Sequence, residues 1–273
     1  MNTPYLTIER GSSYLLCGDK TRDVPMPKTI RVGTFNMLAP CWKRLDSGRE
    51  SSFEHIWKPR IKRLIKELKK HKFHILMLQE FWFEGSYKNQ FVEAFGNEYD
   101  MYFLQRGNKK PDGLLTLISA EKMPSVQEYI GLDYNDFGSR VAQILCFCDV
   151  RVINTHLTFP HPNPYDPIMR RYQAIKLSDF MNTQPQKFYI VGGDFNGSIE
   201  DPAVQKILSR ANLKPMREDS NFFSHLSHNK EQMACDLILC SQRGSFSQVD
   251  IGPLNMDISD HAMVFANVNR VDD

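Results

Sequence analysis

Five short apolar runs along the chain each carry, at one end, a polar side chain of the kind that takes part in chemistry. The runs are rich in aliphatic and aromatic residues and lack helical periodicity, a pattern that predicts buried β-strands. The polar residues are Asn, Asp, Glu or His. The five segments are 32–36, 75–80, 152–157, 189–197 and 259–265. The pattern therefore predicts five core strands that present polar side chains at their tips.

The segment 189–197 is the most informative of these runs. Its apolar residues lead into Gly192 and Gly193, and Asp194 and Asn196 follow one residue apart. Because glycine adopts backbone conformations that other residues avoid, the two glycines predict a tight turn at the end of a buried strand. The turn would present the Asp194 and Asn196 side chains together, an arrangement typical of a catalytic pair.

One segment between the first two runs has helical periodicity. Apolar residues at Ile61, Leu64, Ile65 and Leu68 share one helix face, which predicts a surface helix over 56–72. Most of the other positions are basic: Lys58, Arg60, Lys62, Arg63, Lys66, Lys69, Lys70 and Lys72. We interpret this basic face as solvated, with contact to nucleic acid or to an anionic membrane as the alternative.

Strands and helices alternate along the rest of the chain. Strands are predicted at 30–35, 74–78, 99–104, 114–119, 141–148, 150–155 and 234–239, and helices at 170–181 and 201–211. Alternation of this kind without internal repeats is typical of the layered α/β class. A chain of 273 residues is compatible with one domain of that class.

The amino-terminal segment precedes this core. Two short β-forming segments, 5–8 and 13–16, flank an Arg-Gly-Ser sequence and predict a hairpin. A Pro-Met-Pro sequence then indicates a linker. We therefore expect an N-terminal extension, residues 1–28, followed by a single domain, residues 29–273.

Charge and cysteine content change this picture little. Lys and Arg number 34 and Asp and Glu 32, so the formal net charge of +2 argues neither for nor against a polyanionic partner. The six cysteines are scattered without metal-ligand spacing, so we expect free thiols. The amino terminus lacks a basic segment followed by an apolar one, and no apolar run approaches the roughly 20 residues that span a bilayer. We expect an intracellular protein, cytoplasmic or nuclear, without a transmembrane segment.

Three loops lie between these elements. The segment 105–113 is a basic loop that joins two predicted strands. The segment 133–138 imitates the start of a calcium-binding EF-hand loop, but Phe137 stands at a ligand position and Ile144 replaces the closing glutamate, so no calcium site is expected there. Four prolines in 159–167 exclude helix and strand, which predicts a stiff loop that selects substrate.

The polar residues at the strand ends follow one order along the chain: Asn36, Glu80, His156, Asp194 with Asn196, Asp236, and Asp260 with His261. In this order they resemble the endonuclease/exonuclease/phosphatase superfamily of metal-dependent phosphodiesterases. The resemblance runs from about residue 31 to residue 268 and is nearest to the deadenylase and exonuclease branch. It implies a DNase I-like four-layer α/β sandwich, in which two mixed β-sheets pack face to face with helices outside.

The resemblance also implies roles for individual residues. Magnesium, with manganese as a substitute, would bind through Asn36, Glu80 and Asp260, because this ion prefers oxygen ligands. The catalytic group would consist of His156, Asp194, Asn196, Asp236 and His261. The substrate would contact Lys109, Lys110, Asp112, Tyr165, Arg170 and Arg171.

Each catalytic residue would have its own task. Asp194 would orient or deprotonate the attacking water, and Asn196 would hold the water or a phosphate oxygen. His156 and His261 would donate hydrogen bonds to the developing charge, while Asp236 would hold the His261 ring. The other histidines lack such a pattern and are interpreted as surface or core residues: His55, His71, His74, His161, His225 and His228.

The substrate is open between two classes. The first hypothesis is a nuclease that degrades single-stranded nucleic acid, RNA in particular, from its 3′ end, with Trp42, Phe159 and Tyr165 available for base stacking. The second is a phosphatase or a sphingomyelinase-like phospholipase C that acts on a small or lipid phosphodiester. Inositol 5-phosphatases are disfavoured, because they carry Gly-Asp-Leu-Asn-Tyr-Arg where this chain has Gly-Asp-Phe-Asn-Gly-Ser.

A catalytically silent scaffold of the same fold is a third interpretation. Its usual signature is a substituted Glu, Asp or His in the set, and no such substitution is present here. The sequence indicates no particular protein partner.

Overall fold

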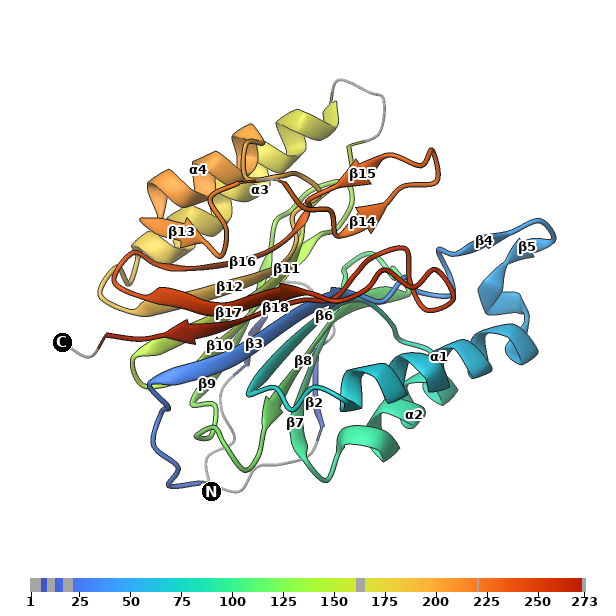
Figure 1. Cartoon of the computed structure of the whole chain (residues 1–273), viewed down its shortest axis with the longest axis horizontal. Coiled ribbons are helices and arrows are strands. Elements are labelled where there is room, and N and C mark those ends of the chain that lie inside the picture. The colour runs from blue at the N-terminus through green and yellow to red at the C-terminus, as the bar shows by residue number, and fades with distance from the viewer. Residues whose placement is uncertain (1–5, 9–12, 17–21, 161–164, 220, 272–273) are drawn as a thin grey trace.

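The protein is a four-layer α/β sandwich (Figure 1). The computed structural model describes residues 6–8, 13–16, 22–160, 165–219 and 221–271. Within these residues, two seven-stranded mixed sheets pack face to face, and helices cover their outer faces. The DNase I-like architecture that the sequence predicts is therefore confirmed.

The two sheets differ in strand order. Among the described residues the first has the order β1-β9-β10-β11-β12-β16-β13 and the second β17-β18-β3-β6-β8-β7-β2. The first consists of β1 (Leu6–Ile8), β9 (Glu128–Asp133), β10 (Val141–Cys146), β11 (Val150–His156), β12 (Phe188–Asp194), β16 (Asp236–Ser241) and β13 (Leu213–Pro215). The second consists of β17 (Ser245–Ile251), β18 (Val264–Asn269), β3 (Thr29–Asn36), β6 (Ile75–Trp82), β8 (Asp112–Ser119), β7 (Tyr99–Gln105) and β2 (Ser13–Leu16).

Helices and two small hairpins complete the fold. Helices α1 (Glu54–Lys69) and α2 (Gly85–Phe95) pack on the second sheet, and α3 (Tyr165–Asn182) and α4 (Pro202–Arg210) pack on the first. The hairpins are β4 (Arg44–Leu45) with β5 (Gly48–Arg49), and β14 (His225–Leu226) with β15 (Gln232–Met233). Both project on the right-hand side of Figure 1.

Parallel strand pairs bring the polar tips together. Strands β3 and β6 run parallel with Asn36 opposite Gln79, and β11 and β12 run parallel with His156 opposite Asp194. The carboxyl ends of parallel neighbours lie at the same edge of a sheet, where α/β proteins bind ligands. The register of the sheets therefore gathers these side chains at one end of the sandwich.

Apolar residues fill three layers between these elements. Met77 and Ile190 lie in the cluster between the two sheets. Trp57 and Leu64 belong to the cluster between the second sheet and α1 and α2, and Ile207 to the cluster under α3 and α4. Each fully buried side chain of this size contributes roughly 1.5–3 kcal/mol to folding. These packed layers support the end of the sandwich at which the polar strand tips meet.

A buried polar network also joins the two sheets. Gln79 Nε2 donates to Asn154 Oδ1 at 2.8 Å, and Asn154 Nδ2 donates to Thr116 Oγ1 at 3.1 Å. Gln79 and Asn154 lie in the predicted strand segments 75–80 and 152–157, and both side chains are buried between the sheets. They fix one sheet against the other rather than line a site.

Three expectations about the elements are wrong. Strands β1 and β2 exist, but β1 pairs with β9 and β2 with β7, so they lie in different sheets and form no hairpin. Helix α3 begins at Tyr165, not near residue 170. Pro167 lies in its first turn, where proline is accepted because the N–H groups of that turn have no intrahelical partner. Residues 161–164 of the predicted stiff loop lie outside the described residues. Arg60, predicted on the solvated face of α1, is buried.

The described helices include none that is both long enough and apolar enough to cross a membrane.

Candidate active site

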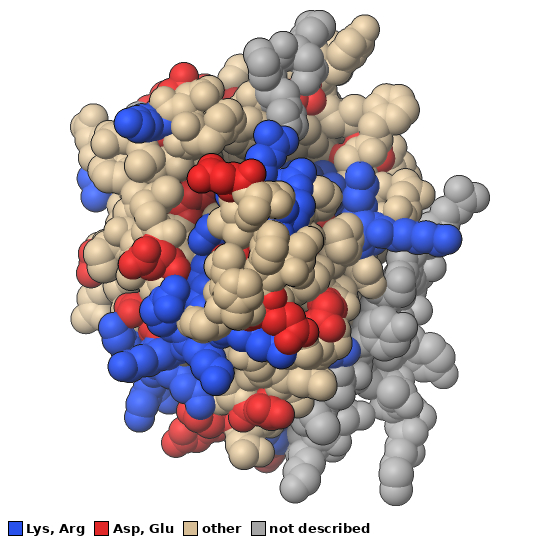
Figure 2. Space-filling model, turned by 90° about the vertical axis from the view of Figure 1, so that its right-hand side faces the viewer, with Lys and Arg blue, Asp and Glu red and all other residues tan. Residues whose placement is uncertain are grey.

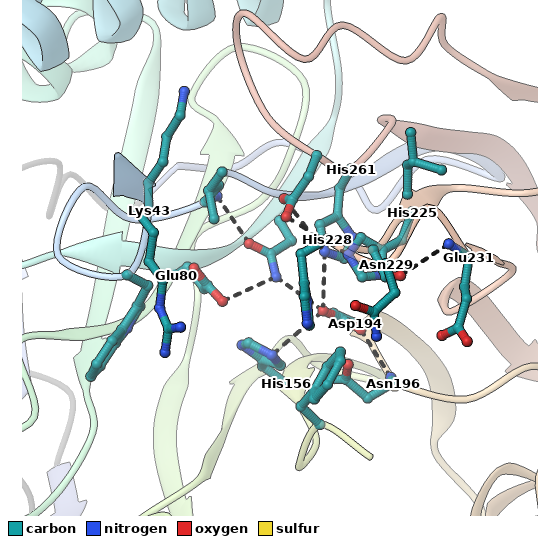
Figure 3. A pocket seen from close by; sticks show the side chains of 18 of the residues that line it. Lys43, Glu80, His156, Asp194, Asn196, His225, His228, Asn229, Glu231 and His261 are labelled. Atoms are coloured by element: carbon teal, nitrogen blue, oxygen red, sulfur yellow. Dashed lines mark hydrogen bonds and ion pairs between the residues drawn. The ribbon is translucent and has the colours of Figure 1, made fainter. Parts of the chain in front are cut away.

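A cavity of about 1050 Å³ opens at the end of the sandwich where the polar strand tips meet (Figure 3). Its walls include residues from both sheets and from both small hairpins. Seven of the residues predicted for metal binding or catalysis line it: Asn36, Glu80, His156, Asp194, Asn196, Asp260 and His261. The structure thus gathers residues that are as far as 225 positions apart (261 minus 36).

Asn36 and Asp194 connect the two sheets at the floor of the cavity. Asn36 Nδ2 donates to Asp194 Oδ2 at 2.9 Å and lies 3.5 Å from Glu80 Oε1. The other amide atom, Oδ1, accepts from the Leu38 N–H at 3.0 Å. These bonds orient the Asn36 amide between the two carboxylates.

Glu80 sits on a β-bulge. The register between β6 and β8 shifts between Gln79 and Phe81, and Glu80 has a φ of 55°. A bulge of this kind redirects a side chain next to a functional site. Glu80 Oε2 accepts from the Ala39 N–H at 3.0 Å. Burial, and then the nearby charges of Asp112 and Asp260, raise the pKa of Glu80 to about 7.

Asp194 lies at the centre of the site (Figure 3). Its Oδ1 accepts from the Asn196 N–H at 2.9 Å, and its Oδ2 lies 3.4 Å from His156 Nε2 and 3.7 Å from His261 Nε2. Burial raises the pKa of Asp194. Asn196 has a φ of 51° and donates its Nδ2 to the carbonyl oxygen of Leu157 at 2.8 Å.

His261 is held by Asp236, as the resemblance implies. Its Nδ1 lies 2.8 Å from Asp236 Oδ2, which also accepts from Ser224 Oγ at 2.7 Å. Burial alone would lower the pKa of His261, but the charges of Asp236 and Asp194 outweigh it and raise the pKa to about 10. The ring is therefore protonated at neutral pH, and its Nε2 is a donor on the Asp194 side.

His156 differs from His261 in charge. Burial, followed by the positive charges of Arg140 and Arg106, lowers the pKa of His156 well below its usual value. The cavity thus holds one neutral and one protonated imidazole on either side of Asp194. The neutral ring can donate from one nitrogen without adding charge.

Asn36, Glu80 and Asp260 fit a divalent cation. Asp260 Oδ1 is buried without a hydrogen-bond partner among the described residues, and the Glu80 carboxylate is buried near other negative charges. Burial would raise the pKa of Asp260, but interactions with His225 and His261 lower it. Partly buried carboxylates, together with the Asn36 amide oxygen that also accepts from the Leu38 N–H, are oxygen ligands of the kind that magnesium prefers.

Two tighter groups of metal-ligand side chains occur in the described part of the chain. They are Asp194 with Cys235 and His261, and His225 with Asp260 and His261. Both require His261, which already pairs with Asp236. Nitrogen and sulfur ligands suit transition metals more than magnesium, so the oxygen set is the better match to the expected ion.

The cavity lining also includes residues that were not predicted, and three of them lie close to the predicted catalytic group. Arg140 lines the cavity near Glu80 and Asp194, its Nη1 has no partner among the described residues, and burial, followed by the charge of Arg106, lowers its pKa to about 10. His225 stacks on His261 with ring centroids 4.1 Å apart, and His228 also lines the cavity. His225 is buried and His228 exposed, as the interpretation of them as core or surface residues expects, but both also line the cavity. No spacing in the sequence marks them, because the β14–β15 hairpin delivers them.

None of the six predicted substrate contacts belongs to the cavity lining. Buried Asp112 accepts two hydrogen bonds from Arg106 Nη1, each 3.0 Å long. Buried Arg170 pairs with Asp201 Oδ2 at 2.8 Å and thereby ties α3 to the N-cap of α4. Both residues thus form ion pairs within the protein. The remaining four also lie outside the lining: Lys109, Lys110, Tyr165 and Arg171. Of the predicted stacking residues, Trp42 and Phe159 do line it.

Figure 2 views the side of the molecule on which both hairpins project. Lys and Arg side chains gather at several places on this face, with the largest group at the lower left. The near-zero net charge of the chain therefore hides local concentrations of positive charge.

Comparison with known proteins identifies similar sequences. Residues 33–261 match the model of the Endonuclease/Exonuclease/phosphatase family. An uncharacterized calcium-binding protein of Arabidopsis thaliana is 33% identical over 256 residues, which cover 79% of this chain and 52% of that protein. The chain thus spans about half the length of this curated relative.

Solved structures show the same fold at low sequence identity. An endonuclease/exonuclease/phosphatase from Bacteroides vulgatus has a TM-score of 0.72 at 17% identity, covering 89% of this chain and 99% of that one. ANGEL2, described as a 2′,3′-cyclic phosphatase and solved with adenosine-2′,3′-vanadate, has a TM-score of 0.71 at 16% identity, covering 88% and 95%.

Proposed function

The chain belongs to the endonuclease/exonuclease/phosphatase family, and on this premise we propose that it is a magnesium-dependent nuclease that degrades single-stranded nucleic acid, RNA in particular, from the 3′ end. Enzymes of this family are hydrolases that act on phosphodiester bonds. The observation that carries the proposal is the arrangement of Asp194 between Asn36, His156 and the His261–Asp236 pair, with Glu80 and Asp260 in the same cavity.

The arrangement supplies the groups that phosphodiester hydrolysis needs. Magnesium held by Asn36, Glu80 and Asp260 would neutralise negative charge on the phosphate. Asp194 Oδ2, the acceptor at the centre of the site, orients the attacking water and takes its proton. Protonated His261 donates from Nε2 to a phosphate oxygen as charge develops.

Two further cavity residues hold the substrate in this mechanism. His156 donates a hydrogen bond from the side of Asp194 opposite His261. Arg140 places next to the carboxylates a guanidinium nitrogen that has no partner in the part of the chain that the structure describes, where a phosphate oxygen would satisfy it. Asn196 lines the same wall and contacts the water or the phosphate.

The depth of the site supports a single-stranded substrate and attack at an end. Asp194 and His261 are 1% and 5% exposed, so the scissile phosphate has to enter the cavity to reach them. A strand end can enter with its bases unpaired, whereas a duplex would first have to separate. Trp42 and Phe159 in the cavity wall offer aromatic surface to an unpaired base.

The experiment compares substrates under one set of conditions. Purified protein with magnesium is given 5′-labelled single-stranded RNA, the same RNA as a duplex, duplex DNA, sphingomyelin and phosphoinositides. We expect stepwise shortening of the single-stranded RNA from its 3′ end, which stops when a chelator removes the metal. Intact RNA together with hydrolysed sphingomyelin or another lipid or small phosphodiester would replace the nuclease proposal by the phospholipase or phosphatase alternative.

Variants connect the activity to this cavity. Asp194→Asn and His261→Ala should each lower kcat by at least about 100-fold, the effect of losing a general base or a charge-stabilising donor. Glu121→Gln, which neutralises an exposed carboxylate outside the cavity lining, is the matched control. Unchanged kcat in Asp194→Asn would show that another site performs the reaction, and an inactive wild type would favour the silent-scaffold alternative.

A further inference from the structure

The β4–β5 hairpin forms a cationic wall of the cavity. The lining residues from this hairpin and its base are Trp42, Lys43, Arg44 and Arg49. Three of these four are basic and none is acidic. The β14–β15 hairpin, in contrast, contributes the acidic Glu231, the neutral Ser227 and Asn229, and the histidines His225 and His228. Charge is therefore distributed unevenly across the cavity mouth.

Arg44 and Arg49 face each other across the hairpin. They are cross-strand partners in the β4–β5 register. Like charges directly opposite each other destabilise a two-stranded ribbon. Within the described residues, neither side chain forms an ion pair, and Arg49 uses Nη1 to donate to the carbonyl oxygen of Trp42 at 2.6 Å. An anion between or beside these guanidinium groups would remove the repulsion.

The acidic residue that follows the hairpin does not neutralise these charges. Glu50 is fully buried and accepts hydrogen bonds from Arg60 Nε and Nη2, and it lies 3.5 Å from Lys43 Nζ. Its charge is thus matched by Arg60 and Lys43. Arg44 and Arg49 remain as the two cations of this wall without an ion pair among the described residues; Arg49 packs over the Trp42 ring, with its guanidinium carbon 5.8 Å from the ring centroid, and Asp46 in the turn pairs with neither arginine.

The hairpin is fixed relative to the catalytic centre. Its base is tied by hydrogen bonds from Trp42 N to Ala39 O at 2.8 Å and from Ser51 N to Pro40 O at 3.0 Å. The Ala39 N–H in turn bonds to the Glu80 carboxylate. The cationic wall and the proposed metal ligand therefore belong to one hydrogen-bonded unit. The conformational entropy of the wall is lost when the protein folds, so little further entropy is lost when a ligand binds.

We propose that the β4–β5 hairpin is a second phosphate site, which binds the phosphodiester that flanks the scissile one in a single-stranded nucleic acid. The inference rests on the proposed nuclease function and names the part of the substrate that gives it specificity. A nucleic acid presents one phosphate for every nucleotide, so a flanking phosphate accompanies every scissile bond except that of a dinucleoside monophosphate. Arg44 and Arg49 bind its oxygens, and Lys43 adds a third positive charge nearby.

The test compares two substrates that differ by one phosphate. A dinucleoside monophosphate contains only the scissile phosphate, whereas a trinucleoside diphosphate also contains the flanking one. The ratio of their kcat/KM values measures the flanking contact. We expect the double variant Arg44→Ala/Arg49→Ala to lower kcat/KM for the longer substrate by at least about tenfold more than for the shorter one, the effect of losing charge-assisted hydrogen bonds.

Salt dependence and a matched variant complete the design. The slope of log kcat/KM for the longer substrate against log salt should become shallower by about 0.7 per lost phosphate contact. Lys62→Ala/Lys66→Ala removes two exposed charges from α1, outside the cavity lining, and should leave the substrate ratio at the wild-type value. Melting temperatures of both double variants report whether the fold is intact.

The outcomes separate this proposal from the proposed function. Equal losses on both substrates, or no loss on either, would overturn the second phosphate site while leaving the nuclease intact. Failure of the wild-type protein to cleave either nucleotide substrate, together with hydrolysis of sphingomyelin, would overturn the nuclease itself and with it the flanking phosphate.

Discussion

At the scale of single residues, Glu80 illustrates how backbone and side chain cooperate in this site. A non-glycine residue at a φ of 55° pays roughly 1–3 kcal/mol of conformational strain. The strain persists because the β6–β8 bulge and the bond from the Ala39 N–H together fix the residue. Without the bulge, the alternation of a strand would send the Glu80 side chain away from Asn36 or into the sheet packing. The bulge is therefore part of the proposed metal site.

Asp236 provides a residue-scale prediction. Asp236→Asn keeps an acceptor for His261 Nδ1–H but removes the negative charge that maintains the imidazolium. We expect kcat on single-stranded RNA to fall by at least about 100-fold while KM changes by less than about threefold, because the proton donor is lost and binding groups remain.

Ser224→Ala is the matched control, because it removes a hydroxyl that donates to the same carboxylate and accepts from the Asp236 N–H, but leaves the negative charge in place. Its loss in kcat should be clearly smaller than that of Asp236→Asn. A wild-type kcat in Asp236→Asn would contradict the assigned role of the carboxylate.

The sequence predicts which strand-end residues come together better than it predicts the residues around them. Asp194, His261 and Glu80 stand in a recognisable order, and they line one cavity. Arg140 and His225 follow no such order, because packing of the surrounding loops and of the β14–β15 hairpin brings them to the site. Long-range contacts of this kind leave no periodic signal in the sequence.

His74 supports a second residue-scale prediction, which concerns stability. Its Nδ1 accepts from the Arg31 N–H at 3.0 Å, and burial, followed by the charges of Lys122 and Arg31, lowers its pKa below 6.5. The unfolded state therefore takes up a proton on His74 at a higher pH than the folded state does. The contribution of His74 to the free energy of unfolding should fall as the pH drops from about 7.5 to about 5.5, through the unfolded-state pKa. The raised pKa values of Glu80 and His261 act in the opposite direction, so the contribution of His74 is measured as the difference between the wild type and a His74 variant.

Urea unfolding at the two pH values tests this prediction. His74→Gln lacks the titrating ring, so its free energy of unfolding should decrease less over the same pH interval. His55→Gln changes an exposed histidine on α1 and should leave the wild-type pH dependence in place. The prediction fails if His74→Gln loses as much stability as the wild type on acidification.

At the scale of secondary-structure elements, the Arg60–Glu50 ion pair joins α1 to the active-site loops. Arg60 Nη1 donates to the carbonyl oxygens of Met37 and Ile258, at 3.1 and 2.8 Å, and Nη2 donates to that of Leu38 at 2.8 Å. One segment follows Asn36 and the other precedes Asp260. The position of α1 thus fixes two loops that carry proposed metal ligands.

Removal of the Arg60 side chain should lower the free energy of unfolding. Arg60→Met leaves the Glu50 carboxylate buried without its main partner, and we expect a loss of about 3–5 kcal/mol in the free energy of unfolding. Arg63→Met, a change of the same type on the exposed face of α1, should cost less than about 1 kcal/mol. Chemical denaturation of both variants gives the comparison, and equal losses would refute the role of the pair.

Elements were predictable where periodicity or strand composition is strong. The first core strand, α1 and α4 lie close to their predicted bounds. The start of α3 was missed, because proline excludes helix interiors but is accepted in a first turn. The pairing of β1 and β2 was missed because two adjacent β segments favour a hairpin locally, whereas here each finds its partner in a different sheet.

At the scale of the whole molecule, the cavity lies at the end of the sandwich and is lined by residues of both sheets. Apolar periodicity alone indicates an α/β protein; the two-sheet architecture follows from the family resemblance, since strand order depends on contacts distant in sequence. The Gln79–Asn154 bond between the sheets gives the site a fixed floor. A ligand that bridges residues of several strands would therefore stabilise the entire fold.

Metal binding should accordingly raise the thermal stability of the protein. A ligand that binds only the folded state at about 100 times its Kd stabilises it by about 2.7 kcal/mol, which corresponds to roughly 5–10 °C for a chain of this size. We expect magnesium to raise the Tm of the chelator-treated protein by this amount, with manganese acting in the same direction. The measurement requires no substrate, so it tests the metal site separately from the nuclease activity.

Three carboxylate variants identify the ligands in the same experiment. Glu80→Gln and Asp260→Asn should each lose most of the magnesium-dependent rise in Tm, because magnesium binds neutral amides far more weakly than carboxylates. In the presence of chelator the Tm of Glu80→Gln should not fall below that of the wild type by a similar amount, since burial raises the pKa of Glu80 and the substitution removes an unfavourable negative charge. The Asp260 carboxylate interacts favourably with His225 and His261, so the magnesium-dependent rise of Asp260→Asn is measured from that variant's own Tm in chelator. Glu231→Gln alters a cavity carboxylate outside the proposed ligand set and should keep the full rise. A wild-type rise in Glu80→Gln would place the metal elsewhere, and the strained conformation of Glu80 would then need a different explanation.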